Sequence, residues 1–579
     1  MSDQKNLVIA IVLCFLIIFG FQYFVEGPQV DAEQQNQAAT NAVDGTTGQA
    51  PTIGADTSSP SIPGSAVPNA VTREESLQKS ERVKINTPSL HGSISLLGAR
   101  LDDLTLVEYH ETVDPTSPEI KLLSPAGSPN PYYAEFGWSP STDSTVALPN
   151  ANTLWSTTTN ELSPEAPLKL TWDNGAGLIF HRTISVDKDY LFTVEQMVEN
   201  KTSSDVTLYP YGLISRHGTP ETTNFYILHE GPIGVLNETL EEVDYDDLSD
   251  GADESYNSTG GWIGITDKFW LTALIPDQKT KIKARFTHTS QGDRFQTDFL
   301  DQQGINVPVG STVGVTNHLF AGAKVVSVLD TYEQEYGIAK FDLAIDWGWF
   351  YFLTKPIYFA LEFFNGLIGN LGLAIMALTV VIKIILLPLA HKSYVSMSKM
   401  KKLQPEMVKL REQFGDDKQK LNQEMMALYK KEKANPAAGC LPIAMQIPIF
   451  FALYKVLFVT LLMRHQPFYG WIKDLAAPDP TTMFNLFGLI PWDPPQFLMI
   501  GVLPLLMGLS MFLQQKLNPQ PADPIQAKIF LFMPIFFTYL LASFPAGLVI
   551  YWTWNNILSM TQQWLIMKRM GVSVSGNKT

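Results

Sequence analysis

A chain of 579 residues is long enough for more than one domain, and its charge is divided unequally along it. Residues 26–348 carry 45 acidic against 19 basic side chains, net −26, whereas the remainder carries 12 against 22, net +10. So acidic a region argues against nucleic acid as its partner, and DNA in particular. The two cysteines, Cys14 and Cys440, provide neither a disulfide framework nor a set of metal ligands.

Six apolar runs are each long enough to cross the ~30 Å hydrocarbon core of a bilayer. They cover residues 7–24, 371–390, 441–463, 496–513, 529–544 and 546–566. The first run lies within residues 1–25 and is predicted to be an uncleaved anchor, because no small-residue cleavage motif follows it; a cleaved signal peptide is the alternative. The chain is therefore predicted to be a polytopic α-helical membrane protein with six spans.

The positive charges of the short loops predict the orientation, because Lys and Arg are retained on the cytoplasmic side. Residues 391–435 hold eleven of them and the short basic tail 567–579 holds three, whereas residues 464–495 hold only two. Six spans with both termini in the cytoplasm fit this distribution. Residues 26–348 then lie outside, between the first and second spans.

The region outside the membrane has two textures. Residues 26–75 are Gln, Ala, Thr, Gly, Pro and Ser with almost no large apolar side chain, which predicts a disordered tether. Residues 76–345 contain short alternating runs, such as LIFHRTISV and KIKARFTHT, separated by turn signals such as Asn174-Gly175. This pattern predicts an all-β sandwich.

The predicted sandwich contains seven histidines and many carboxylates, which could suggest a sugar enzyme or a metal site. They are scattered, however, and no catalytic or metal-binding motif accompanies them. We therefore expect no enzyme, no metal and no cofactor, and favour a docking or chaperoning surface.

Residues 346–370 are aromatic and apolar but are interrupted by Lys355, Pro356 and Glu362. This composition predicts an amphipathic helix lying along the outer membrane interface, with its aromatic side chains among the headgroups. The alternative is a helix that covers the sandwich.

Residues 391–435 predict a cytoplasmic helical hairpin, because apolar residues recur at spacings of three and four and the sequence Gly-Asp-Asp at 415–417 interrupts them. The apolar stripe contains Met397, Met400, Met407 and Met425. Methionines form a soft surface that can adapt to varied chains, although such a stripe is also the ordinary seam of a hairpin. The opposite face, with a net charge of +5 over the segment, suits anionic lipid or ribosomal RNA, or is simply solvated.

The predicted second span, residues 371–390, contains Lys383. At ~1.5 Å per residue this lysine lies about 18 Å from the outer end of the helix, beyond the midplane. A lysine at the centre of a span costs about 2.5–3.5 kcal/mol, so it should face a partner or water, the alternative being a side chain that snorkels to the headgroups. No acidic residue lies in the spans to pair with it, but polar residues do, and they predict a wet cavity: Thr379, Gln446, Asn555, Asn556, Ser559, Gln562 and Gln563.

Several long motifs, among them LQPEM, QIPIFFALYKVL and FPAGLVIYW, resemble the YidC family of membrane protein insertases, in the form with a large periplasmic domain. The resemblance covers almost the whole chain. It implies a bacterial inner-membrane location, a periplasmic β-supersandwich and a five-helix core, with spans three to six in residues 436–566. This core holds a hydrophilic groove open to the cytoplasm and to lipid. Lys383 takes the place of a family arginine, and Trp552 that of a second tyrosine.

The expected function is that of an insertase, which takes nascent membrane proteins into the groove and releases their apolar segments into lipid, alone or with the Sec translocon. The ribosome is expected to bind only weakly, because the tail is short. A solute or ion carrier would need inverted repeats and a paired intramembrane charge, and an anchored chaperone would work mainly through the β domain. The expected groove residues are Thr379, Lys383, Gln446, Tyr551, Trp552, Asn555 and Asn556, and the expected hairpin contacts are Met397, Met400, Met407 and Met425.

Overall fold

The computed structural model describes most of the chain beyond residue 70. The described residues are 71–141, 146–222, 228–415, 417–432, 441–487, 490, 492, 494–495, 498–518 and 524–570. The predicted anchor and nearly all of the predicted tether lie outside them. A short helix, α3 (Arg73–Leu77), begins within the range predicted for the tether.

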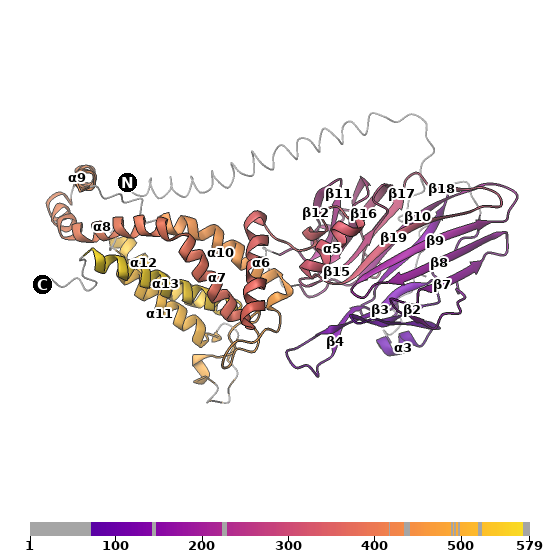
Figure 1. The fold of residues 1–579 in the computed structure, drawn as a ribbon, viewed down its shortest axis with the longest axis horizontal. Coiled ribbons are helices and arrows are strands. Elements are labelled where there is room, and N and C mark those ends of the chain that lie inside the picture. Colours follow the sequence, from indigo (N-terminus) through magenta and orange to yellow (C-terminus); the bar gives the residue numbers. More distant parts are fainter. Residues whose placement is uncertain are drawn as a thin grey trace. The chain divides into compact units, whose positions relative to one another are not determined.

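Two antiparallel sheets make up the predicted all-β region (Figure 1). Among the described residues the larger sheet has eleven strands, in the order β13 (Glu254–Thr259), β16 (Lys281–Thr289), β17 (Arg294–Asp301), β10 (Val206–His217), β5 (Tyr132–Pro140), β3 (Arg100–His110), β2 (Leu90–Ser95), β1 (Arg82–Asn86) and β6 (Glu161–Leu162), with β18 (Ile305–Val307) beside β10 and β4 (Glu119–Leu123) beside β3. The other has eight, in the order β12 (Thr239–Glu242), β11 (Gly231–Leu236), β14 (Trp262–Thr266), β15 (Trp270–Ile275), β19 (Thr312–Ala323), β9 (Leu191–Asn200), β8 (Leu178–Val186) and β7 (Leu168–Asp173). One pair, β1 with β6, is parallel. The predicted all-β domain is confirmed.

Alternation of side chains accounts for these strands. Along β8 every second residue is buried, as the run LIFHRTISV predicts, and β8 pairs with β9 over its whole length. The turn between β7 and β8 contains Gly175 at φ 69°, and the amide of Asn174 donates to the carbonyl of Leu178 at 3.1 Å. Fully buried aromatic side chains such as Phe180 and Trp262 fill the core, each contributing about 1.5–3 kcal/mol of burial.

One buried cation links the two sheets. Strands β3 and β5 share a single register pair, Leu101 opposite Ala134, so the carbonyls next to this seam need other donors. Arg182, on β8 of the other sheet, is 3 % exposed and supplies them. Its Nη1 donates to the carbonyl of Ala99 at 3.2 Å and its Nη2 to the carbonyl of Phe136 at 2.5 Å. Burial lowers the pKa of Arg182 to about 10.

A short helix, α4 (Tyr245–Ser249), lies between β12 and β13, and two helices, α5 (Val326–Tyr336) and α6 (Tyr351–Ile368), follow the last strand. On α6, the ammonium of Lys355 lies 2.9 Å from a carboxylate oxygen of Asp330 and 2.8 Å from one of Asp342. One face of α6 is buried, with Leu361 fully covered, whereas Phe352 and Phe363 on the other face are 74 % and 67 % exposed. One face of the helix is thus packed against the protein, and the other exposes aromatic side chains.

The remaining described helices correspond to the apolar runs and the hairpin segment. They are α7 (Leu371–Ile385), α8 (Leu387–Phe414), α9 (Lys418–Lys431), α10 (Leu441–Val459), α11 (Val502–Leu517), α12 (Pro524–Leu540) and α13 (Ala546–Arg569). Taken singly, none of the described helices combines the length and apolarity needed for a membrane crossing; α7 and α8 do so only together, with a bend of 70° between them.

The bend corrects the prediction of one continuous helix over residues 371–390. The chain leaves the first helix at Leu386, because Pro388 follows two residues later in the first turn of α8. A proline lacks the backbone N–H that would continue the first helix, and its ring restricts the preceding residue. Beyond the bend, α8 and α9 are the two helices predicted for the hairpin, and Asp417 caps α9 by accepting from the amide of Lys420 at 3.0 Å.

Candidate functional site

Lys383 lies near the C-terminal end of α7. This helix starts at an N-cap, Asn370, whose side-chain oxygen accepts from the amide of Leu373 at 3.0 Å. Its apolar face, which includes Ala374 and Ile375, is buried in the main hydrophobic core. Lys383 lies in the last turn of the helix and is only partly exposed.

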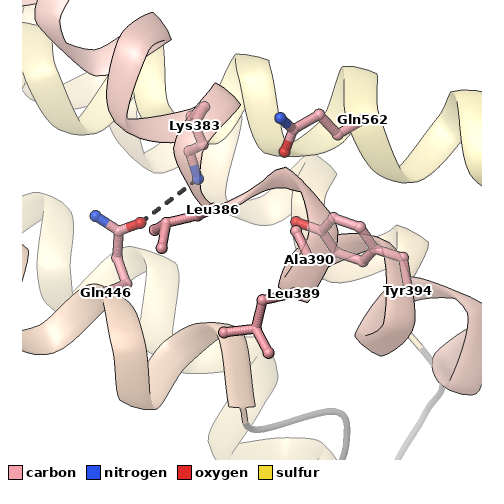
Figure 2. Close-up of a pocket in the computed structure, with 7 residues that line it drawn as sticks. All are labelled: Lys383, Leu386, Leu389, Ala390, Tyr394, Gln446 and Gln562. Atoms are coloured by element: carbon pink, nitrogen blue, oxygen red, sulfur yellow. Dashed lines mark hydrogen bonds between the residues drawn. The ribbon is translucent and has the colours of Figure 1, made fainter.

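The ammonium of Lys383 joins side chains from two other helices, and Figure 2 shows its bond to Gln446. Its Nζ donates to the hydroxyl of Ser559 on α13 at 2.8 Å and to the amide oxygen of Gln446 on α10 at 3.5 Å. Gln446 in turn donates through Nε2 to the hydroxyl of Tyr551 at 2.6 Å. Among the described residues no carboxylate forms an ion pair with Lys383. The charge is therefore held by neutral partners only.

A small cavity lies beside this lysine. Its volume is about 30 Å³, and it is lined by Lys383, Leu386, Leu389, Ala390, Tyr394, Gln446 and Gln562. The side-chain oxygen of Gln562 is buried and has no hydrogen-bond partner. A cavity of this size holds on the order of one or two water molecules, whereas pockets for drug-sized ligands measure about 300–1,000 Å³. The cavity is lined mostly by apolar surface, with polar groups of Lys383, Gln446 and Gln562 at its wall, and it has no room for a polypeptide segment.

The periodicity of α13 explains which predicted residues reach Lys383. Tyr551, Asn555, Ser559 and Gln562 follow one another at spacings of three and four, so they share one face of the helix. Asn555 is buried, and its side-chain oxygen has no partner. Trp552 and Asn556 lie on the adjacent face and point elsewhere.

The other predicted groove residues make their contacts away from Lys383. Asn556 donates to the hydroxyl of Ser510 on α11 at 2.9 Å, and the ring of Trp552 lies 4.7 Å from that of Phe450 and 5.9 Å from that of Phe537, centroid to centroid. Thr379 is buried and donates to the carbonyl of Ile375, one turn back on its own helix, at 2.7 Å. The structure thus brings Lys383, Gln446 and Tyr551 together. Thr379, Trp552 and Asn556 do not line the cavity.

Comparison with known proteins decides the family. A model of the YidC periplasmic domain matches residues 82–360, and a model of the 60Kd inner membrane protein matches residues 363–573. The membrane protein insertase YidC of Methylobacterium nodulans is 53 % identical over 99 % of this chain and 96 % of its own length. That of Beijerinckia indica is 51 % identical over 99 % and 97 %. The chain belongs to the YidC family of membrane protein insertases.

A solved structure of an active YidC insertase also matches, with 16 % identity over 83 % of this chain and 92 % of that one, at a TM-score of 0.32. Membership of the YidC family makes the chain an insertase of the inner membrane with a periplasmic β domain, and not an enzyme. Nascent membrane proteins are its substrates.

Four residues that line the cavity of this YidC chain were missed by the sequence reasoning, namely Leu386, Leu389, Ala390 and Tyr394. Tyr394 lies on α8, eleven residues after Lys383, and it lines the cavity only because the chain bends at Leu386. No sequence signal gives the direction of such a bend. Gln562 and Ser559, by contrast, were recognisable as polar residues in the last span.

The four hairpin methionines are in different surroundings. Met397 is buried in a cluster with Tyr394, and Met400 packs against the same cluster. The sulfur of Met407 accepts from the hydroxyl of Tyr429 on α9 at 3.6 Å, and Met425 is partly exposed. Met407 therefore lies in the seam of the hairpin, the ordinary alternative for such a stripe, whereas Met397 and Met400 face the helical core.

Proposed function

We propose that the Lys383 cavity is the closed form of the groove through which this insertase receives nascent chains. The observation that carries the proposal is the pairing of Lys383 with a hydroxyl and an amide only. Neither partner neutralises the ammonium, so an acidic side chain entering the groove would form a charge-assisted hydrogen bond. Such a bond is stronger in a site from which water is largely excluded.

The route of the substrate follows from this electrostatic step. A short segment outside the apolar part of the nascent chain enters from the cytoplasm, where Lys383, Gln446 and Tyr551 replace part of its hydration. The apolar segment that follows moves into lipid, driven by burial of its side chains. For an acidic segment moving outward, the membrane potential adds to this driving force. Thr379, Trp552, Asn555 and Asn556 remain proposed contacts along this path.

The proposed topology has six spans, with both termini in the cytoplasm and residues 26–348 in the periplasm. It is supported by the distribution of Lys and Arg and by the apolar runs. We propose that α6 lies in the outer membrane interface, since its exposed side chains include Phe352 and Phe363.

The hairpin is the proposed first contact of the nascent chain. A groove of about 370 Å³ lies between α8 and α9, with Leu410 and Leu428 among its lining residues and charged side chains such as Lys409 and Glu424 around them. Its size is within the usual ~300–1,000 Å³ range of ligand pockets. We propose transient contact of the basic hairpin with ribosomal RNA and anionic lipid, and cooperation with the Sec translocon for some substrates.

The test is site-specific photo-crosslinking to a stalled single-span nascent membrane protein in native membranes. The photoreactive residue replaces Gln562, which lines the cavity, and in a matched control it replaces the neighbouring Thr561, which is exposed on the same helix. We expect crosslinks from position 562 that appear at a defined chain length, disappear after release and exceed those from position 561. Membranes that insert the substrate without any crosslink from position 562 would refute the groove.

A further inference from the structure

A tryptophan of α13 is hydrogen-bonded to the backbone of α7. The indole Nε1 of Trp554 donates to the main-chain carbonyl of Met376 at 3.1 Å. Met376 lies in the interior of α7, where a carbonyl ordinarily accepts from the amide four residues later, so the indole uses the second lone pair of this oxygen. An indole N–H can only donate, and in apolar surroundings it needs an acceptor. The ring of Trp554 is therefore bound to one point on α7.

This bond lies on the side of α7 that carries Lys383. Met376 and Lys383 are seven residues apart, which is about two turns, so they face the same way and are separated by about 10 Å along the helix axis. The ammonium of Lys383 in turn donates to the hydroxyl of Ser559 on α13 at 2.8 Å. Two hydrogen bonds thus join α7 to α13, one at the ammonium and one about two turns before it.

On α13 the two partners lie on opposite flanks of one face. At about 100° per residue, Trp554 lies about 60° to one side of Tyr551, and Ser559 lies about 80° to the other side. Between them, the hydroxyl of Tyr551 accepts from Gln446, which is the second partner of Lys383. The two hydrogen bonds therefore hold α7 at both flanks of this face, which resists rotation of α7.

The rest of α7 gives little direction to the lysine. Its buried side chains, such as Ala374, Ile375 and Leu378, are apolar and pack in the main core. Apolar packing is non-directional, whereas a hydrogen bond requires alignment of donor and acceptor. Lys383 is in the last turn of α7, and its long stem could otherwise carry the ammonium to the headgroups. The height and rotation of α7 thus decide whether the ammonium reaches Ser559.

We propose that Trp554 is a positioning residue for Lys383. Its indole fixes the height and rotation of α7 against α13, so that the ammonium stays at Ser559 and Gln446 beside the cavity. Through Lys383, Trp554 favours insertion of substrates whose translocated segment is acidic. This last step rests on the proposed electrostatic role of Lys383, whereas the placement of the ammonium does not.

The first experiment removes the indole donor and keeps the shape of the ring. In the full-length protein in lipid nanodiscs, 3-benzothienylalanine, which has a sulfur in place of the N–H, replaces Trp554 by nonsense suppression. An amine-reactive reagent then acylates the protein, and mass spectrometry compares the rate at Lys383 with that at the exposed Lys392. We expect Lys383 to react about threefold faster than in wild type, the factor that one hydrogen bond between membrane helices supplies.

Two controls accompany this measurement. The same replacement at Trp564, which is 43 % exposed on the same helix, should leave the Lys383 rate unchanged. 5-Fluorotryptophan at position 554 keeps the N–H and should react as wild type does. An unchanged Lys383 rate with benzothienylalanine at position 554, or an equal increase with benzothienylalanine at position 564, would overturn the proposal.

The second experiment separates positioning from general support of the fold. Insertion is measured with two single-span substrates, one with an acidic translocated segment and one with amides in place of its acidic residues. With benzothienylalanine at position 554, we expect the ratio of the acidic to the amide rate to fall by about threefold. Equal slowing of both substrates, with an unchanged Lys383 acylation rate, would mean a merely structural role and overturn the proposal. Faster acylation with an unchanged ratio would support positioning and refute the electrostatic step, so the two failures are distinguishable.

Discussion

Neither Arg182 in the β domain nor Lys383 in the helical region is in direct ion-pair contact with a carboxylate among the described residues, but their surroundings differ. The guanidinium of Arg182 donates to two main-chain carbonyls, and its Cζ lies 4.9 Å from the ring centroid of Trp155. The partners of Lys383 are a side-chain hydroxyl and a side-chain amide next to a small cavity. The first cation is fixed by the backbone, whereas the second can exchange its partners for those of a ligand.

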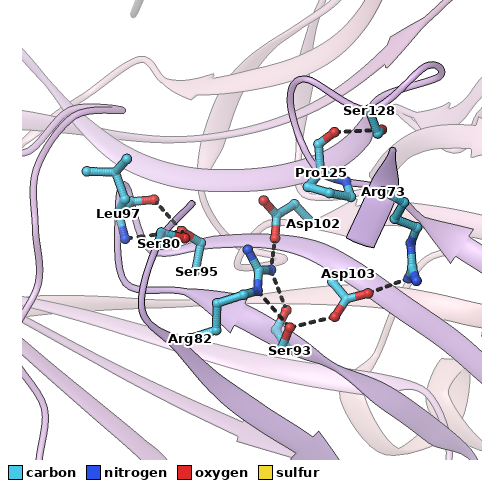
Figure 3. Close-up of polar contacts among 10 residues, drawn as sticks. All are labelled: Arg73, Ser80, Arg82, Ser93, Ser95, Leu97, Asp102, Asp103, Pro125 and Ser128. Atoms are coloured by element: carbon cyan, nitrogen blue, oxygen red, sulfur yellow. Dashed lines mark hydrogen bonds and ion pairs between the residues drawn. The ribbon is translucent and has the colours of Figure 1, made fainter. Parts of the chain in front are cut away.

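Other charged side chains of the β domain are also held by neighbouring groups, and here these groups include carboxylates (Figure 3). Arg73 on α3 forms an ion pair with Asp103, and Arg82 forms one with Asp102, both on β3. The hydroxyl of Ser93 accepts from Nε of Arg82 at 2.7 Å and donates to Asp103 at 2.5 Å. Here each charged group has a charged or hydrogen-bonding partner, so the network stabilises the start of the domain. The contrast teaches that a buried charge points to substrate binding only where its partners can be exchanged.

Replacing Arg182 with methionine should produce the largest loss of stability. Two buried carbonyls would lose their donors, and each unsatisfied group costs about 1–3 kcal/mol, so we expect the free energy of unfolding to fall by about 2–5 kcal/mol. The measurement is denaturant unfolding of the full-length protein in detergent, followed by near-ultraviolet circular dichroism. Lys169→Met, on the exposed face of β7, is the matched control and should change little. Equal midpoints for the two variants would show that the Arg182 contacts contribute nothing.

Replacing Lys383 with serine should leave folding intact and impair insertion. A hydrogen bond to a charged group is worth about 1.5–3 kcal/mol, so the insertion rate of a substrate with an acidic translocated segment should fall by about tenfold or more. A substrate whose acidic residues are replaced by amides should be affected much less. Reconstituted vesicles with both substrates provide the measurement. Undiminished insertion of the acidic substrate would remove the electrostatic step and make Lys383 a merely tolerated lysine.

Local patterns predicted much of the fold. Alternation gave β8 and β16 with their bounds, and three-to-four spacing gave α8 and α9. The order of strands was not predictable, because pairs such as β10 with β17 join residues about 80 positions apart through side-chain packing that no local signal encodes. Arg182 could have been recognised as a charged residue at an inward position of β8, but its partners depend on an irregularity between β3 and β5.

The sequence likewise predicted only some of the residues of the candidate site. Tyr551 and Asn555 lie on the face of α13 that carries Ser559, which a helical periodicity of 3.6 residues could have shown. Asn556 was grouped with them by its place in the inner half of the span, and Trp552 by the family resemblance; neither criterion takes the helix face into account. Tyr394 was unpredictable, since it depends on the bend at Leu386.

Lys324 is another buried cation of the β domain, and the pH dependence of stability tests its surroundings. It is buried, its ammonium donates to the hydroxyl of Thr266 at 2.9 Å, and burial lowers its pKa to about 8, against an opposing effect of Asp267 and other carboxylates. The unfolded chain keeps the ordinary value of about 10.4, so between about pH 8 and 10.4 the unfolded state binds more protons than the folded state. The contribution of this group to stability therefore rises with pH in that window.

The measurement compares wild type with Lys324→Met, which cannot titrate at this position. We expect the difference between their thermal unfolding midpoints to shift in favour of wild type between pH 7.5 and pH 9.5, chosen as about half a unit below and one and a half units above the lowered pKa. Other groups titrate equally in both proteins and cancel in this difference. Parallel curves over the range would mean that Lys324 is not desolvated in the folded state.

The smallest expected effect comes from replacing Lys383 with arginine, the residue type of Arg182. Lys383→Arg keeps the positive charge and introduces the residue that the family resemblance implies at this position. Its planar guanidinium donates in a fixed fork, which suits a carboxylate, but it is bulkier than an ammonium beside a cavity of about 30 Å³. These effects oppose each other, so insertion of the acidic substrate should stay within about threefold of wild type, a difference below ~1 kcal/mol. If Lys383→Arg instead fails as completely as Lys383→Ser, charge alone does not explain the site, and the ability of the lysine to exchange the hydroxyl of Ser559 and the amide of Gln446 for substrate becomes the decisive property.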